Sequence, residues 1–117
     1  MKPSSSFPPF SPAALHILLS LSGEDRHGYA IMQEIARQTG GKYKPGPGTL
    51  YDNLEKLLNL GLIDEAPAPK RGDDPRRRYY RLTNLGRRAL AEEIHRLETV
   101  TRIARENLGI STARNAL

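Results

Sequence analysis

Apolar residues recur at helical spacing in three segments of the first half of the chain, and turn-forming residues separate these segments. Ser11 and Pro12 suit the N-cap and the first turn of a helix, which is predicted to end near Leu21. A second amphipathic helix is predicted within 29–41, where the final two glycines end it. A third is predicted over 48–60, after a turn rich in proline and glycine, because its leucines follow the i, i+4, i+7, i+8 pattern.

The second half of the chain predicts two short strands and one long helix. The strands are expected within 62–69 and 76–83, with turn formers between them. Thr83 suits the N-cap of the long helix. Along this helix, six apolar or small residues are separated alternately by four and three positions, which is the spacing of a coiled-coil seam. These seam positions, which we expect to form a dimer interface, are Leu90, Ile94, Leu97, Thr101, Ala104 and Leu108.

This order of elements predicts a mainly α chain with a small β-hairpin (α+β), arranged as a winged helix-turn-helix plus a long C-terminal dimerisation helix. A length of 117 residues fits one domain. Residues 1–11 are expected to form a flexible arm, because the first twelve residues contain four prolines and four serines. The winged helix-turn-helix is expected over 12–83, and the dimerisation helix with a short tail over 84–117.

Basic residues are concentrated in one segment of the chain. The net charge of the whole chain is +5. Residues 70–88 contain eight Lys or Arg against two Asp, which gives +6, so the rest of the chain sums to −1. An excess confined in this way is typical of a surface that binds a polyanion, although a solvated loop without a partner would show the same run.

The predicted third helix has a polar face opposite its leucines. At about 100° per residue, that face carries Gly48, Thr49, Asp52, Glu55, Lys56 and Asn59, with Tyr51 and Asn53 at its flanks. In a winged helix-turn-helix, the third helix enters the DNA major groove, and the hairpin reaches the adjoining backbone or minor groove. Gly48 and Thr49 keep the start of this helix slim, so phosphates can approach its unpaired N–H groups.

Three segments resemble the PadR family of transcriptional regulators. They are 27–35 (HGYAIMQEI), 47–63 (PGTLYDNLEKLLNLGLI) and 76–90 (RRRYYRLTNLGRRAL), and the resemblance extends over about residues 13–108. It implies a homodimer that binds double-stranded operator DNA, usually represses transcription, and is released by a small-molecule effector or another signal. Together with the patterns above, the resemblance leads to these expected DNA-binding residues: Tyr29, Lys44, Gly48, Thr49, Tyr51, Asp52, Lys56, Asn59, Lys70, Arg71, Arg76, Arg77, Arg78 and Tyr79.

Catalysis and metal binding find little support in the sequence. No serine or threonine has a histidine and a carboxylate at a recognised motif spacing, and the PGPG segment lacks the lysine and serine of a phosphate loop. The chain has no cysteine and three scattered histidines, of which His27 is expected to cap the second helix. We therefore expect neither an enzyme nor a cofactor or metal site. The lack of a long apolar run predicts a cytoplasmic protein without a membrane partner.

A second class of function stays open at this point. Asp52 and Glu55 lie on the face of the third helix where basic or amide side chains are more usual at DNA. This pair is compatible with a winged-helix module that binds protein or RNA without specific DNA readout. The arginine-rich second strand favours DNA instead. Tyr79 of that strand is assigned equally to the core and to DNA.

Overall fold

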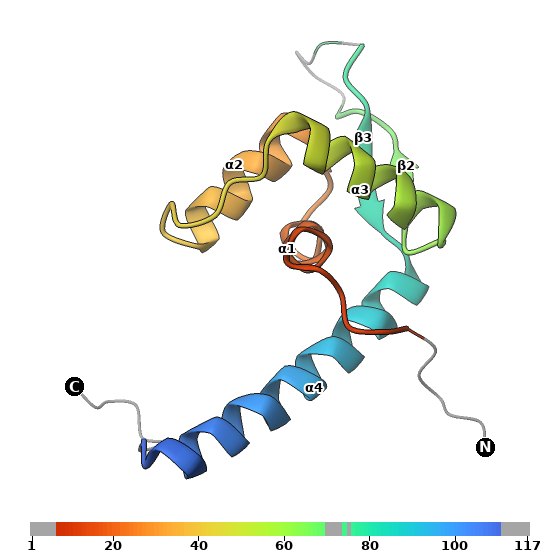
Figure 1. Cartoon of the computed structure of the whole chain (residues 1–117). Coiled ribbons are helices and arrows are strands. Elements are labelled where there is room, and N and C mark those ends of the chain that lie inside the picture. Colours follow the sequence, from red (N-terminus) through yellow and green to blue (C-terminus); the bar gives the residue numbers. More distant parts are fainter. Residues whose placement is uncertain (1–6, 70–73, 75, 111–117) are drawn as a thin grey trace.

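The computed structural model describes residues 7–69, 74 and 76–110. Lys70 and Arg71, two of the expected DNA contacts, lie outside the described residues. The described residues form four helices and a small antiparallel sheet (Figure 1). In chain order the elements are α1 (Pro12–Leu21), β1 (Arg26–His27), α2 (Gly28–Gln38), α3 (Pro47–Asn59), β2 (Ile63–Ala66), β3 (Tyr79–Leu82) and α4 (Asn84–Leu108). The predicted fold class, mainly α with a small β-hairpin, is confirmed.

Side-chain caps begin two of the helices at the residues that the sequence indicates. The Ser11 hydroxyl accepts a hydrogen bond from the Ala14 N–H at 3.2 Å, so α1 has the bounds expected for it. The Thr83 hydroxyl accepts from the Gly86 N–H at 2.9 Å and donates to the Gly61 carbonyl at 2.7 Å. Thr83 therefore both caps α4 and ties its start to the end of α3.

Helix α3 begins one residue earlier than predicted. Pro47 is its first residue, which is favourable because the first helical position does not need the N–H that proline lacks. Gly61 has φ 76°, a left-handed conformation that glycine adopts without strain, and it ends the helix as expected. The proline and glycine turn therefore sets where α3 starts, and a second glycine sets where it stops.

The sheet has three strands rather than the two of the predicted hairpin. The strand order is β1-β3-β2, and both pairs are antiparallel. Arg26 of β1 pairs with Tyr80, and His27 pairs with Tyr79. The sequence pattern assigns this segment to a turn. Its two residues count as a strand only because they form hydrogen bonds with the edge of β3.

Both tyrosines of β3 are buried, although strict alternation would leave one of them exposed. Tyr80 belongs to the main core. Tyr79 is 8% exposed, and its ring lies edge-on to the His27 ring with the centroids 5.2 Å apart. The structure therefore assigns Tyr79 to packing, which corrects its place among the expected DNA contacts.

The core is built around α1. Ile17 and Leu18 are fully buried and belong to one cluster with side chains from the other helices and the sheet, namely Ala14, Leu21, Ile31, Ile35, Leu50, Leu54, Leu57, Leu62, Ile63, Tyr80, Leu82, Ala89 and Leu90. The leucines of α3 thus face α1, and the polar face of α3 is turned outward.

The first turns of α4 are packed into this core, and the rest of the helix extends away from it (Figure 1). A Cβ atom at Gly86 would lie 2.0 Å from the Leu62 carbonyl oxygen, so glycine permits the close approach of α4 to the end of α3. Leu90 is 7% exposed and belongs to the protomer's own core. This corrects the prediction that Leu90 lies in a dimer seam.

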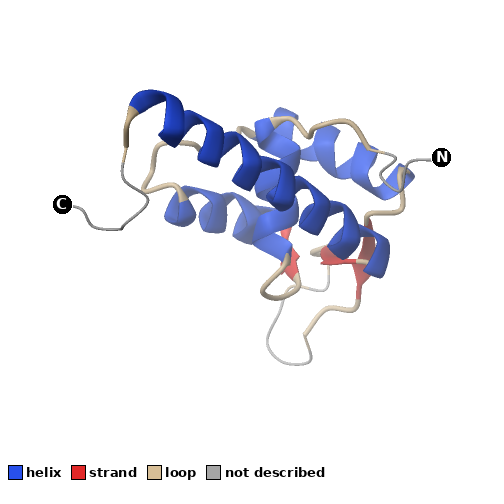
Figure 2. Ribbon diagram, turned by 90° about the horizontal axis from the view of Figure 1, so that it is seen from below, coloured by secondary structure: helices blue, strands red, loops and turns tan. Residues whose placement is uncertain are grey.

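Beyond Leu90, α4 carries apolar side chains that the domain does not cover. In Figure 2, which is seen from below, α4 lies in front of the other helices. Ile94 is exposed and Leu97 is half-buried, while Thr101, Ala104 and Leu108 are exposed. Val100 and Ile103, which the seam pattern does not include, are exposed as well.

Part of the expected flexible arm contacts the fold. The Phe7 and Phe10 rings are stacked with their centroids 6.2 Å apart, and both pack against the core. The Phe10 N–H donates to the buried Glu93 carboxylate of α4 at 3.2 Å. Residues 7–10 of the expected arm therefore lie against the fold.

Candidate nucleic-acid interface

The outward face of α3 gathers six of the expected DNA contacts on one surface. Its leucines are fixed in the core, so the residues between them point to solvent. The exposed members are Gly48, Thr49, Tyr51, Asp52, Lys56 and Asn59 together with Glu55. Tyr51 is the largest of these side chains and is 50% exposed. The structure thus brings these residues together as the sequence predicts.

The N-terminal end of α3 is open to an approaching anion. No side chain caps this end, and a Cβ atom at Gly48 would meet nothing within 4 Å. Lys44 is exposed in the turn before the helix. The unpaired N–H groups and the helix dipole favour negative charge at such an end.

The wing, defined as β2, β3 and the described residues between them, carries four exposed arginines, Arg76, Arg77, Arg78 and Arg81. Arg76 makes two side-chain hydrogen bonds of 3.1 Å to Asp74, and these bonds lower the pKa of Asp74. Arg78 forms an ion pair with Glu65, whose hydrogen bond raises the pKa of Arg78. Exposed ion pairs of this kind contribute little to stability, so phosphates can replace the carboxylates.

A cavity of about 310 Å³ lies where the start of α2, α3 and the wing meet. His27 caps α2, since its Nδ1 accepts from the Ala30 N–H at 3.2 Å, which matches the role expected for it. On the other side of the ring, Nε2 lies 3.2 Å from Nη1 of Arg77. Tyr29 is 54% exposed beside this cavity. We call this place the junction.

Gly28 controls how closely α3 approaches the junction. A Cβ atom on Gly28 would lie 2.3 Å from the Tyr51 hydroxyl oxygen. Glycine at this position therefore lets the Tyr51 hydroxyl lie against the first residue of α2. Sequence reasoning did not identify His27 or Gly28 as part of the surface, and the only available signal was the HG pair that opens the second helix.

Acidic side chains limit what the α3 face can bind. Asp52 and Glu55 can only accept hydrogen bonds when ionised, so they suit a cytosine amino group and repel phosphate. Lys56 and Asn59, farther along the same face, offer donors. The face therefore carries both acceptors and donors, while most of the positive charge lies on the wing.

A metal-ligand cluster and a membrane-spanning helix are both absent from the part of the chain that the structure describes. Within residues 7–69, 74 and 76–110, no group of histidine and carboxylate side chains could hold a metal ion. No helix in the same ranges has the length and apolar character needed to cross a bilayer.

Comparisons with known proteins agree with this geometry. Residues 17–92 match the profile of the family described as "Transcriptional regulator PadR-like family". Transcriptional regulator Rv3488 of Mycobacterium tuberculosis is 39% identical over 95 residues, which is 81% of each chain. A transcriptional regulator from Clostridium thermocellum has a similar structure, with a TM-score of 0.69 and 26% identity over 80% of this chain and 87% of that one. A PadR family regulator from Clostridium difficile shares the fold, with a TM-score of 0.71 and 22% identity over 84% of this chain and 99% of that one.

Proposed function

The chain belongs to the PadR-like family of transcriptional regulators, and from this premise we propose that it is a homodimeric repressor that binds a specific operator in double-stranded DNA and is released by a small-molecule effector or another signal. The family and its relatives are regulators rather than enzymes, which confirms the prediction that the chain is not an enzyme. We place its action in the cytoplasm, where it would meet operator DNA.

One observation carries the DNA-binding proposal: the exposed polar face of α3 lies beside the wing arginines. Tyr51 of α3 and Arg78 of the wing both line the junction. A helix in the major groove and cations at the neighbouring backbone are the two components of winged-helix recognition. The surface thus combines groups that read bases with groups that bind phosphates.

The exposed part of α4 supports dimerisation. Ile94 is exposed and Leu108 is 71% exposed, and both lie on the same side of the helix as Leu97. Each large apolar side chain left in water forgoes roughly 1.5 to 3 kcal/mol of burial. A second α4 with the same face would cover these positions symmetrically.

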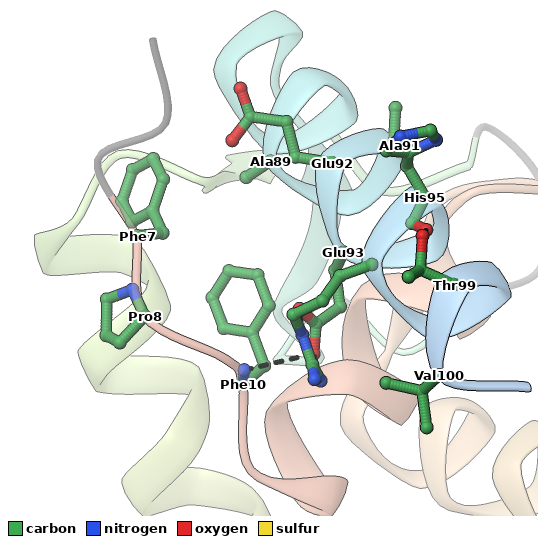
Figure 3. Close-up of a pocket in the computed structure, with 11 residues that line it drawn as sticks. Phe7, Pro8, Phe10, Ala89, Ala91, Glu92, Glu93, His95, Thr99 and Val100 are labelled. Carbon is green, nitrogen blue, oxygen red and sulfur yellow. Dashed lines mark hydrogen bonds and ion pairs between the residues drawn. The ribbon is translucent and has the colours of Figure 1, made fainter. Parts of the chain in front are cut away.

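A cavity between the N-terminal arm and α4 supports release by an effector. Figure 3 shows Phe7, Pro8 and Phe10 on one side of it and residues of α4, including His95 and Val100, on the other. Its volume is about 680 Å³, within the usual range for small-molecule sites. Glu93 at its base pairs with Arg96 at 2.9 Å, so the dashed hydrogen bond from Phe10 joins the arm to a fixed point of the helix.

The experiment that tests the proposal is selection of bound sequences from random duplex DNA. We expect a common motif with two-fold symmetry, because a symmetric dimer presents two copies of α3. Light scattering of the free and bound protein gives the oligomeric state. Recovery of no enriched motif, together with weak binding that is the same for every duplex, would favour the protein- or RNA-binding module that Asp52 and Glu55 suggest.

A further inference from the structure

We propose that a cavity between the N-terminal arm and α3 binds a small monocarboxylate with an apolar chain, and that Lys56 of α3 pairs with its carboxylate. This cavity is separate from the one between the arm and α4. Such a ligand would withdraw Lys56 from DNA, so the regulatory part of the proposal rests on the DNA-binding function proposed above.

The cavity has the size of a small-molecule site and an apolar interior. Its volume is about 560 Å³, within the usual range for such sites. Phe7 and Phe10 line it from the arm, and Leu57 and Leu60 line it from the end of α3. Leu60 is 51% exposed, so a ligand with an apolar chain would remove a large side chain from water.

Contacts with α4 hold the arm, so the wall of the cavity exists without a ligand. The Phe10 N–H donates to the Glu93 carboxylate at 3.2 Å, as Figure 3 shows. Two hydrogen bonds of 2.9 Å from Arg96 fix that carboxylate in turn. Phe7 stacks on Phe10 and packs, like it, against the core. A preformed wall of this kind lowers the entropic cost of binding.

The cavity has one positive charge and no negative charge among the described residues that line it. The charge belongs to Lys56, whose ammonium group has no ion-pair partner within the described ranges. Asn53, one turn earlier, donates one amide hydrogen to the Thr49 carbonyl at 2.8 Å, which leaves the second hydrogen for another acceptor. A carboxylate can accept from both groups while its apolar chain lies against the leucines and the phenylalanine rings. A second charge on the ligand would have no partner here.

Lys56 lies at the border between this cavity and the outward face of α3. It lines the cavity together with Asn53 and Leu60, whereas Asp52 and Asn59 of the outward face do not line it. A lysine side chain is a flexible stem with one compact charge, so it can reach an acceptor on either side of this border. It cannot serve both acceptors at once, so the ligand and DNA compete for it.

The first test is isothermal titration calorimetry of the whole protein with octanoate. Octanol and octylammonium are matched probes that have the same chain with no charge or with the opposite charge. We expect octanoate to bind about fivefold more tightly than octanol, as for an exposed ion pair, and octylammonium to bind more weakly than octanol. Affinity should rise about three- to fourfold for each methylene added between hexanoate and octanoate, because each one is buried. Equal affinity for the three octyl probes would overturn the proposal.

Substitutions then locate the ligand. Leu60→Gln and Lys56→Gln should each lower octanoate affinity about fivefold, and only Leu60→Gln should also lower octanol affinity. Ile103→Gln on α4 and Lys44→Gln before α3 are the matched controls and should bind octanoate like the wild type. Val100→Gln tests the cavity that borders α4, which Val100 lines. A loss in Val100→Gln with none in Leu60→Gln or Lys56→Gln would place the ligand against α4 and overturn the proposal.

The last test links the site to DNA. Fluorescence anisotropy measures binding of the selected operator in octanoate or in acetate at the same concentration, so the ionic strength is constant. Octanoate should weaken operator binding by the wild type by no more than the loss seen in Lys56→Gln, and acetate should have no such effect. Leu60→Gln should bind the operator like the wild type but respond less to octanoate, because Leu60 is not an expected DNA contact. Lys56→Gln should bind the operator more weakly and should not respond to octanoate.

The outcomes separate this proposal from the proposed function. Operator binding without octanoate binding, or octanoate binding that leaves operator affinity unchanged, would overturn the proposal and leave DNA binding intact. Octanoate binding that depends on Leu60 and Lys56, in a protein that binds no duplex, would support the site and overturn the DNA-binding function. If circular dichroism shows that Leu60→Gln does not fold, Lys56→Gln and the three octyl probes decide the question.

Discussion

Arg78 and Glu65 form an ion pair across the wing. The Arg78 guanidinium, which is expected to contact DNA, is therefore already paired with a carboxylate. The Arg78 guanidinium also lies 5.9 Å from the centroid of the buried Tyr80 ring. The wing therefore presents less positive charge than its run of three arginines indicates. DNA must displace Glu65 to reach Arg78.

Removal of this competing carboxylate should strengthen DNA binding. In Glu65→Gln, Arg78 is released to a phosphate, so we expect affinity to rise several-fold at low salt. The slope of log affinity against log salt should steepen by up to about 0.9, the value for one neutralised phosphate. Fluorescence anisotropy at four salt concentrations measures both quantities. Glu106→Gln, which removes the exposed partner of Arg102 on α4, is the control, and weaker binding by Glu65→Gln would show that Glu65 positions Arg78 for DNA.

Two substitutions on α3 should separate positioning from base readout. Asp52→Ala should relax preference at one base pair of each half-site by roughly 1 to 3 kcal/mol, because it removes an acceptor for a base edge. Tyr51→Phe should weaken every sequence about equally, because its hydroxyl is expected to meet a phosphate. Competition with the operator and its single-base variants distinguishes these results. Unchanged affinity and preference in both folded variants would indicate that α3 does not read DNA.

The face of α4 that is proposed to form a dimer can be tested by introducing a charge on either side of the helix. Leu97→Glu should yield a monomer or an aggregate, because a buried, unpaired carboxylate is strongly destabilising at an apolar interface. Ile103→Glu, on a different side of the helix, should leave the oligomeric state unchanged. Light scattering over a range of concentrations measures the result. The opposite pattern would move the interface to the side of α4 that carries Ile103.

Gly86 should be intolerant of even a methyl group. In Gly86→Ala the new Cβ would lie 2.0 Å from the Leu62 carbonyl oxygen, so α4 must shift away from the core. We expect a loss of about 1–3 kcal/mol or more in the free energy of unfolding. Urea denaturation measures it. Gly23→Ala is the matched control, since a Cβ there would meet nothing within 4 Å, and equal stability of the two variants would contradict the proposed close packing.

Glu34 should make the stability of the protein sensitive to acid. Its side chain is buried and accepts hydrogen bonds from Arg37 and Gln38 at 2.6 and 2.8 Å. The hydrogen bonds from Arg37, opposed by burial, lower the pKa of Glu34 from 4.5 to about 2. A folded-state pKa below the unfolded one stabilises the protein above about pH 4.5, and this contribution is lost as the pH falls towards 2.

Comparison with Glu34→Gln tests this dependence. At pH 7 the variant should be less stable by about 1–3 kcal/mol, the cost of weakening a buried charged hydrogen-bond network. Only the wild type has a carboxylate at this position, and protonation removes the stability that its ionised form provides. The difference in the free energy of unfolding between the two proteins should therefore shrink as the pH falls from about 4.5 towards 2. Urea denaturation at a series of pH values provides the measurement. A constant difference would mean that ionisation of Glu34 does not stabilise the fold.

Local signals in the sequence were sufficient to predict most elements of the fold. Ser11, Thr83 and Gly61 act on their immediate neighbours, so their effects can be read from a few residues. Strand β1 could not be predicted, because its two residues pair only with a β3 that is more than fifty residues away in sequence. The docking of Phe10 on Glu93 depends in the same way on a long-range contact.

The candidate site shows the same division. Helical periodicity placed Tyr51 and Asp52 at the exposed side of α3 correctly, because the buried leucines before and after them, Leu50 and Leu54, define the opposite face. Periodicity alone could not show that Leu90 belongs to the protomer's own core, since a core position and a seam position have the same spacing. Nor could composition show that carboxylates accompany the wing arginines, because Glu65 lies thirteen residues before Arg78.

The anchoring of α4 has a geometric consequence for regulation. Gly86 and Leu90 hold the first turns of this 25-residue helix against the core, so helix and winged domain turn as one rigid lever about 37 Å long. In the proposed dimer, a change of about 5° in the angle between two such levers would move the α3 helix of each protomer by about 3 Å. That displacement is close to the separation of successive base pairs, about 3.4 Å. A ligand too small to touch DNA would thereby shift one α3 by nearly one base-pair step relative to its half of the operator.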